Sequence, residues 1–150
     1  MKVETLRWRE GALELIDQRV LPQRFEYIRC TSASETADAI RNMVVRGAPA
    51  IGCAAAYGIA VEAQRLRLSL AQFDSEMERA FSLLAASRPT AVNLTWALDR
   101  MRGVWQKNLD RPYERLLQEA HAIREEDIRG NREMGKNGAA LIEDGATVLT

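Results

Sequence analysis

The sequence predicts an α+β fold, mostly α, in which a small antiparallel β-sheet at the amino end precedes a helical bundle. Apolar and polar residues alternate within the first thirty positions, the pattern of half-buried strands. From residue 32 onward the apolar residues recur at helical spacing. A glycine and a short β-branched stretch occupy residues 145–150, as at the start of a parallel α/β sheet. The predicted fold therefore ends at the first strand of a second, missing domain.

The first three predicted elements are strands. Segments 4–8 and 12–16 alternate apolar with polar residues and flank Arg9-Glu10-Gly11, as the two arms of a hairpin do. Segment 25–30 is a third candidate strand and follows Leu21-Pro22. Together these segments predict the antiparallel sheet.

Helices are predicted from residue 32 onward. Ser32 and Glu35 have the spacing of a capping box, in which each side chain satisfies a free amide at the helix start. The helix that they open is expected to stop near Gly47, with Ala39, Ile40, Met43 and Val44 on its apolar face. Pro49 suits the first turn of the next helix, which is expected to reach about Leu66, because its missing N–H would have no partner there.

Four more helices are predicted from breaks and apolar periodicity. They follow the capping-box spacing of Ser69 and Gln72, the break at Arg88-Pro89-Thr90, the break at Asp110-Arg111-Pro112, and the apolar positions in 134–142.

The predicted domain boundary lies at residue 145. Residues 1–144 are expected to form an amino-terminal domain, and residues 145–150 to begin a second one, because a lone strand at 147–150 has no partner in a helical domain. The alternative is a free-standing helical interaction module, in which Val148 and Leu149 pack inside the domain.

Composition excludes several functional classes. Twenty-one Lys and Arg balance 21 Asp and Glu, so no global field attracts nucleic acid or an anionic membrane, and any anion must be held locally. The most apolar stretch, 48–61, is too short to span a bilayer. The two cysteines lack the spacing of a metal or redox site, which favours a cytoplasmic location without a metal centre.

The first candidate site surrounds Gly47. Gly47 allows a positive φ without a Cβ penalty, and Pro49 directs the free amides of Ala50 and Ile51 out of the helix start. Such a helix end suits phosphate, and Arg46 could add a bidentate guanidinium contact. The alternative is a tight helix–helix connection whose arginine is solvated or paired.

The second candidate site repeats this arrangement. Arg88 precedes Pro89, which is expected to open a helix, with Thr90 able to cap it and Asn93 one turn in. If both helix starts face one cleft, two guanidiniums and two helix dipoles converge on one dianion. The alternative for Arg88 is a surface arginine.

Other conspicuous residues are predicted to be structural. The small residues of 52–58 suit close helix packing, and Cys53 within them is expected to be a buried hydrophobe rather than a nucleophile. His121, the single histidine, is expected on a solvated helix face. Trp96 and Trp105 are expected in the core or a subunit interface.

Three stretches resemble the methylthioribose-1-phosphate isomerase family, which belongs with the initiation factor 2B alpha, beta and delta subunits. Residues 43–52 with 54–58 are similar to its long amino-terminal motif, and residues 88–94 with Trp96-Ala97 to its second motif. Leu15-Ile16-Asp17-Gln18 with Leu21-Pro22 fits its opening segment. Thr95 and Cys53 depart from the pattern, where an aromatic and an aliphatic residue are more usual.

The resemblance implies a fold, a reaction and a site. It implies a larger Rossmann-like second domain, a homodimer, and conversion of 5-methylthioribose 1-phosphate to 5-methylthioribulose 1-phosphate in methionine salvage, without a metal or organic cofactor. The catalytic cysteine and aspartate would lie beyond Thr150, so neither Cys30 nor Cys53 inherits that role. The substrate-binding residues carried over are Arg46, Gly47, Ala48 and Arg88. The chain alone would be inactive.

Two other functions occur within the same fold family. A ribose-1,5-bisphosphate isomerase would carry a second phosphate in place of the methylthio group. A regulatory subunit of the initiation factor 2B kind would be an interaction protein without turnover.

Overall fold

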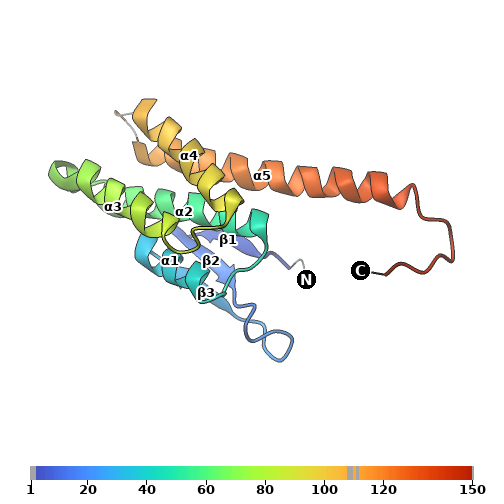
Figure 1. The fold of residues 1–150 in the computed structure, drawn as a ribbon. Helices are drawn as coiled ribbons and strands as arrows, with labels where there is room; N and C mark the ends of the chain where they lie inside the picture. The colour runs from blue at the N-terminus through green and yellow to red at the C-terminus, as the bar shows by residue number, and fades with distance from the viewer. Residues whose placement is uncertain (1–2, 108–109, 111, 150) are drawn as a thin grey trace.

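The chain folds as a three-stranded antiparallel sheet followed by helices, as the computed structural model of residues 3–107, 110 and 112–149 shows (Figure 1). The strands are β1 Leu6–Arg9, β2 Ala12–Ile16 and β3 Tyr27–Cys30. The helices are α1 Ala33–Arg41, α2 Ala48–Leu66, α3 Phe73–Ala85, α4 Val92–Lys107 and α5 Pro112–Ala139, with a 3-10 turn η1 at Leu70–Gln72. The predicted α+β, mostly α fold is confirmed.

The sheet has the order β1-β2-β3, and both of its pairs are antiparallel. Arg9 pairs with Ala12 across the tight turn, where Glu10 and Gly11 have φ values of 50° and 72°. Two positive φ values are what the commonest two-residue hairpin turn requires. The predicted hairpin is therefore confirmed, with β1 and β3 shorter than expected.

The helix α1 begins at the predicted capping box. The Ser32 hydroxyl accepts a hydrogen bond from the Glu35 amide at 3.2 Å, and the Glu35 carboxylate accepts one from the Thr31 amide at 2.6 Å. The helix ends at Arg41, well before Gly47, because Met43 takes a left-handed conformation with φ 59°. Met43 is consequently half-exposed and does not join the apolar face.

The central element of the fold is α2, which contacts β1, β2 and each of the other α-helices. Figure 1 shows α4 and α5 above it and the sheet and α1 below it. Ala54, Ala55 and Ala56 are fully buried. A helix with apolar residues all round is one that is covered all round, so the small side chains predicted to allow close packing do so here.

The remaining helices differ from the predictions at their ends. Ser69 does not cap α3: its N-cap is Gln72, which makes no side-chain capping bond. Pro89 does not open α4, which starts three residues later at Val92. The helix predicted at Pro112 is confirmed, but it continues to Ala139 and absorbs the separate helix expected further on.

The carboxyl-terminal part of α5 extends past the ends of the other helices, and the segment after it turns back beneath the helix without joining the bundle (Figure 1). Residues 147–149 form no strand in the described part of the chain, contrary to the prediction, because no neighbouring strand pairs with them there. Val148 and Leu149 are 58% and 98% exposed, the opposite of what a free-standing module predicts. Thr150 lies outside the described residues. The domain boundary at residue 145 stays a prediction.

Within the described residues, no helix is both long enough and apolar enough to cross a membrane.

Candidate anion-binding site

Gly47 forms the start of α2 as its N-cap, with φ 96° and ψ 127°. An added Cβ there would meet nothing within 4 Å. The position therefore needs glycine for its backbone conformation and not for space, since L-residues rarely adopt this φ. Of the two conformations expected to be open to Gly47, a tight turn or a positive φ, the structure shows a positive φ.

The first turn of α2 presents its amides differently from the prediction. The Ile51 amide donates to the Gly47 carbonyl at 3.0 Å, so it is already part of the helix ladder. Pro49 has no N–H, which leaves the amides of Ala48 and Ala50 without an intrahelical acceptor. The prediction was right for Ala50 and wrong for Ile51, whose place as a free donor is taken by Ala48.

The segment before Gly47 is anchored by its backbone. Val44 and Val45 are buried, and the Val44 carbonyl accepts from the Gln18 amide at 3.0 Å. The Gln18 carboxamide donates to the Arg46 carbonyl at 3.3 Å. The exposed Arg46 guanidinium makes no hydrogen bond or ion pair with the described residues. A fixed backbone thus carries an uncommitted cation beside the helix start.

The second site lies in the turn between α3 and α4. The Ala91 amide donates to the Arg88 carbonyl at 3.0 Å, and the Ala91 carbonyl accepts from Thr95 at 3.2 Å. Ala91, not Thr90, therefore occupies the cap position, and the prediction for Thr90 was wrong. Val92 and Asn93 supply the first amides of α4.

The first turns of α2 and α4 lie together, as a shared anion site requires. A Cβ on Gly52 would approach the Asn93 carbonyl oxygen to 2.8 Å, so α2 and α4 cross in almost direct contact near their first turns. Figure 1 shows both amino ends on the same side of the bundle. A cavity of about 180 Å³ between them is lined by Pro49, Asn93 and Trp96 among others.

The two guanidiniums are not brought into one cavity. Arg46 lines a separate cavity of about 540 Å³ beneath the α1–α2 loop. Arg88 lines neither that cavity nor the one between the helix starts. The structure therefore unites the helix ends and leaves the convergence of Arg46 and Arg88 a prediction.

An ion pair neutralises one carboxylate near the helix starts. Glu126 lines the cavity between them and accepts two hydrogen bonds from Arg100, at 2.6 and 2.9 Å. These bonds hold the pKa of Glu126 below its ordinary value. Arg100 also lies 5.5 Å from the ring centre of Trp96, which is 49% exposed, whereas Trp105 is buried as predicted.

The model of the initiation factor 2 subunit family matches residues 44–150, which include both helix starts. The chain belongs to this family. The resemblance found in the sequence is thereby confirmed.

Two similar relatives of this family member are methylthioribose-1-phosphate isomerases. The chain is 61% identical to the methylthioribose-1-phosphate isomerase of Albidiferax ferrireducens, over 99% of the chain and 43% of that protein. It is 46% identical to the one from Thermotoga maritima, over 100% of the chain and 44% of that protein. The chain thus spans less than half the length of these relatives.

Two solved structures share the fold. The 5-methylthioribose 1-phosphate isomerase of Pyrococcus horikoshii superposes with a TM-score of 0.90 and 37% identity, over 96% of this chain and 42% of that one. Subunit delta of translation initiation factor eIF-2B from A. fulgidus gives a TM-score of 0.81 and 40% identity, over 96% and 43%.

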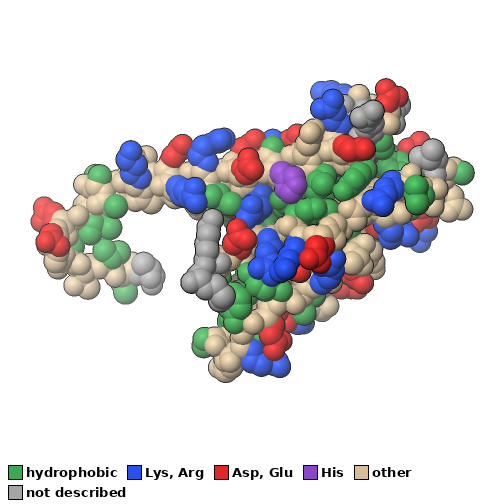
Figure 2. Space-filling model, turned by 180° about the vertical axis from the view of Figure 1, so that it is seen from behind, with side chains coloured by type: hydrophobic (Ala, Val, Ile, Leu, Met, Phe, Trp, Pro, Cys, Tyr) green, Lys and Arg blue, Asp and Glu red, His purple; other side chains and the backbone are tan. Residues whose placement is uncertain are grey.

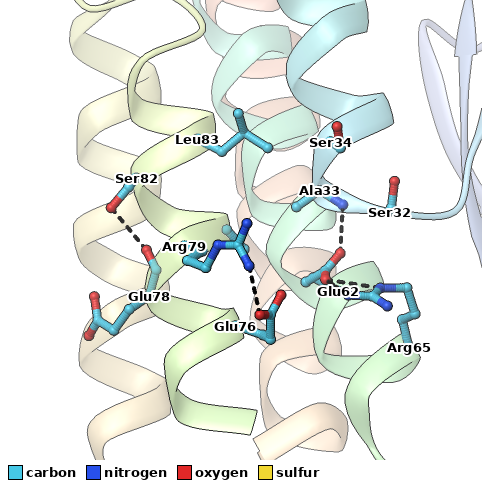
Figure 3. A pocket seen from close by; sticks show the side chains of 11 residues that line it. Ser32, Ala33, Ser34, Glu62, Arg65, Glu76, Glu78, Arg79, Ser82 and Leu83 are labelled. Carbon is cyan, nitrogen blue, oxygen red and sulfur yellow. Dashed lines mark hydrogen bonds and ion pairs between the residues drawn. The ribbon is translucent and has the colours of Figure 1, made fainter. Parts of the chain in front are cut away.

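Another cavity of this family member, about 830 Å³ in volume, lies between α1, α2 and α3 (Figure 3). Glu62 in its wall is 5% exposed and accepts from the Ala33 amide at 2.9 Å and from Arg65 at 3.0 Å. Arg79 pairs with Glu76 at 2.9 Å. Glu62 thus stabilises the start of α1. Because these charges are paired with one another, neither pair leaves a free charge for a ligand.

Neither cysteine is a nucleophile in this structure. Cys30 and Cys53 are buried, and burial raises their pKa values to about 11 and about 12. A thiol at neutral pH is a poor nucleophile, in agreement with the packing role predicted for Cys53. Among the described residues, no cluster of His, Cys, Asp and Glu could hold a metal ion.

His121 is half-buried, so the predicted solvated helix face describes only part of its surroundings. Its Nδ1 lies 2.7 Å from the hydroxyl of Tyr57, which is fully buried and stacks on Trp8. Figure 2 shows the single histidine, in purple, at the edge of a hydrophobic area. The contact joins residues 64 positions apart, so no local sequence pattern predicts it.

This pair predicts that the chain loses stability in mild acid. Burial lowers the pKa of His121, with Glu125 opposing and Arg124 reinforcing the shift. The neutral ring can accept the Tyr57 hydroxyl proton at Nδ1, whereas a protonated ring has no acceptor nitrogen and leaves that buried proton unpaired. The stability is fully present above about pH 6.5 and is lost as the pH falls through the folded-state pKa.

Urea unfolding at pH 7.5 and 5.5 checks this, with about 1 kcal/mol less free energy of unfolding expected at the lower pH. Carboxylates that stay ionised between pH 5.5 and 7.5 change the free energy of unfolding little over that range. The variant His121→Leu should show a flatter dependence, and an equal loss in both proteins contradicts the assignment.

Proposed function

We propose that this chain is the amino-terminal, substrate-positioning domain of a cytoplasmic, homodimeric methylthioribose-1-phosphate isomerase that acts in methionine salvage. Residues 1–144 would form this domain and residues 145–150 would begin a Rossmann-like one. The observation that carries the proposal is the crossing of two arginine-preceded helix starts at Gly52 and Asn93. The identity of 61% to an isomerase of that name supports the substrate.

The proposed role of the site is to hold the C1 phosphate. The amides of Ala48 and Ala50 and the positive end of α2 attract a phosphate dianion. Arg46 and Arg88 supply charge-assisted hydrogen bonds from the segments before the two helices. Gly47 gives the loop the conformation that keeps these donors at the helix end. Holding the substrate in one geometry lowers the entropic part of the barrier.

The chemistry itself is assigned to the second domain. A phosphate on C1 blocks the simple ring opening of an aldose, so an acid must help open the ring before hydrogen moves between C1 and C2. The Cys30 and Cys53 thiols are buried and protonated here. The family resemblance implies a cysteine and an aspartate as the catalytic pair; we propose that both lie beyond residue 150 and expect the chain alone to be inactive.

A chimaera tests this proposal. This chain would replace the matching 43% of the Albidiferax ferrireducens relative, and the product would be assayed with 5-methylthioribose 1-phosphate. Formation of 5-methylthioribulose 1-phosphate, followed by NMR, is expected from the chimaera and not from the 150-residue chain. Turnover of ribose 1,5-bisphosphate alone would move the protein to the neighbouring isomerase.

A second candidate is a non-catalytic subunit that senses sugar phosphates. The likeness to subunit delta of eIF-2B favours it, although its TM-score of 0.81 is lower than the 0.90 found for the isomerase. Substrate binding by a folded chimaera without any turnover would favour this candidate over the enzyme.

A further inference from the structure

The cavity beneath the α1–α2 loop, called here the basic cavity, has a volume of about 540 Å³. It is lined by Gln18, Arg19, Leu21, Arg41, Asn42, Met43 and Arg46. This wall brings together the segment after β2 and the residues that end α1. The opening motif at Asp17-Gln18, which the proposed function leaves unused, thus borders a cavity.

The charged groups that line the basic cavity are all cationic. Arg19, Arg41 and Arg46 belong to its wall, and no carboxylate does among the described residues. Arginine presents five N–H donors and no acceptor. A cavity with this wall is complemented by an anion rich in acceptor oxygens.

Two of these guanidiniums are held in place and keep donors to spare. Arg19 donates through Nε and Nη2 to Asp17, at 2.8 and 2.7 Å, which leaves Nη1. Arg41 donates through Nη1 to Asp38, which leaves Nε and Nη2. Arg46 has no ion-pair partner among the described residues.

The frame of the basic cavity is rigid. Hydrogen bonds from Arg19 hold the pKa of Asp17 below its ordinary value, and the Asp17 side chain is only 4% exposed. Gln18 ties the opposite wall through its bonds to the Val44 and Arg46 carbonyls. The Arg19 and Arg41 guanidiniums, each bonded to an aspartate, are therefore oriented before any ligand arrives.

The backbone at Met43 is strained at the wall of the basic cavity. Its φ of 59° is a left-handed conformation that is unfavourable for a non-glycine residue. Strained backbone persists where its surroundings fix it, and such residues cluster at ligand sites. Met43 is also 50% exposed, so burial of its side chain does not explain the conformation.

We propose that the basic cavity binds the phosphate group of a small molecule through Arg19 and Arg41, apart from the two helix starts to which Arg46 is assigned. Planar guanidiniums match phosphate in a bidentate manner. The volume lies in the range of ligand pockets and has room for a phosphate ester as well as the free ion. The site stands on the residues of its own wall and does not depend on the proposed isomerase activity.

A titration of the isotope-labelled chain tests the site. Inorganic phosphate and ribose 5-phosphate would each be added at constant ionic strength while backbone and side-chain N–H signals are recorded. Shifts are expected at the Gln18 and Asn42 carboxamides and at the Arg19 and Arg41 Nε groups. Tighter binding of the ester identifies a phosphate ester as the ligand, and equal binding identifies free phosphate.

Two variants make the test decisive. Arg41→Gln is expected to raise the Kd at least about fivefold, whereas Arg67→Gln, an exposed arginine at the far end of α2, should change it less than about twofold. The spectra themselves report whether each variant folds. The proposal is overturned if Arg41→Gln binds like the unaltered chain, or if the shifts are confined to Ala48, Ala50 and Asn93. That second pattern leaves the isomerase proposal intact.

Discussion

Replacing Arg46 or Arg88 with alanine in the active chimaera is expected to lower kcat/KM for 5-methylthioribose 1-phosphate by about 10- to 150-fold each. The figure corresponds to about 1.5–3 kcal/mol, the range for a hydrogen bond to a charged group. In the proposed site each guanidinium would contact the same phosphate from a different helix start, so neither could replace the other. Steady-state kinetics at fixed ionic strength measure the effect.

Matched variants separate the charge from the geometry. Arg46→Lys keeps the positive charge and loses the planar fork, so it should recover part of the lost kcat/KM. Arg67→Ala removes an exposed arginine far from the helix starts and should leave the kinetics unchanged. Saturation kinetics that stay unaltered in both Arg46→Ala and Arg88→Ala would rule out a phosphate clamp.

Features that depend on neighbouring residues could be predicted from the sequence. The Ser32–Glu35 capping box spans one helical turn, and its two hydrogen bonds form as its spacing requires. Gly47 was expected to allow a tight turn or a positive φ because it has no Cβ, and its φ is 96°. The hairpin around Gly11 likewise depends on residues that are close together in the chain.

Helix ends were harder to predict because contacts elsewhere in the fold decide them. The apolar period continues through Met43, yet α1 stops at Arg41 so that Val44 can bond to Gln18. Pro89 looked like a helix opener, but α4 begins at Val92. Apolar spacing could not register the Val44–Gln18 bond, since it joins residues 26 positions apart along the chain.

The candidate site was predictable in part for the same reason. Each arginine-proline segment could be recognised in the sequence by itself. The sequence could not show that the two segments lie close together in the fold. The close approach of Gly52 to Asn93 shows it for the helix starts. The basic cavity was not foreseen, because it takes Arg19 from the segment after β2 and Arg41 from the end of α1.

Replacing Gly52 with alanine is expected to lower the free energy of unfolding by about 2 kcal/mol and to reduce turnover of the chimaera at the same time. The new Cβ would lie 2.8 Å from the Asn93 carbonyl oxygen and 3.3 Å from its carbon. Both atoms are backbone in the first turn of α4, so no side chain can rotate to make room. Overpacking of this kind typically costs 1–3 kcal/mol. Chemical denaturation measures the loss.

The matched control is Gly103→Ala, also within a helix, where an added Cβ meets nothing within 4 Å. Alanine has the higher helix propensity, so this variant should gain about 0.5–1 kcal/mol. The same propensity gain acts at Gly52, and a net loss there therefore measures the steric cost of separating α2 from α4. If Gly52→Ala were as stable and as active as the Gly103→Ala variant, the contact between the helix starts would not matter. The phosphate site would then have to be assembled without it.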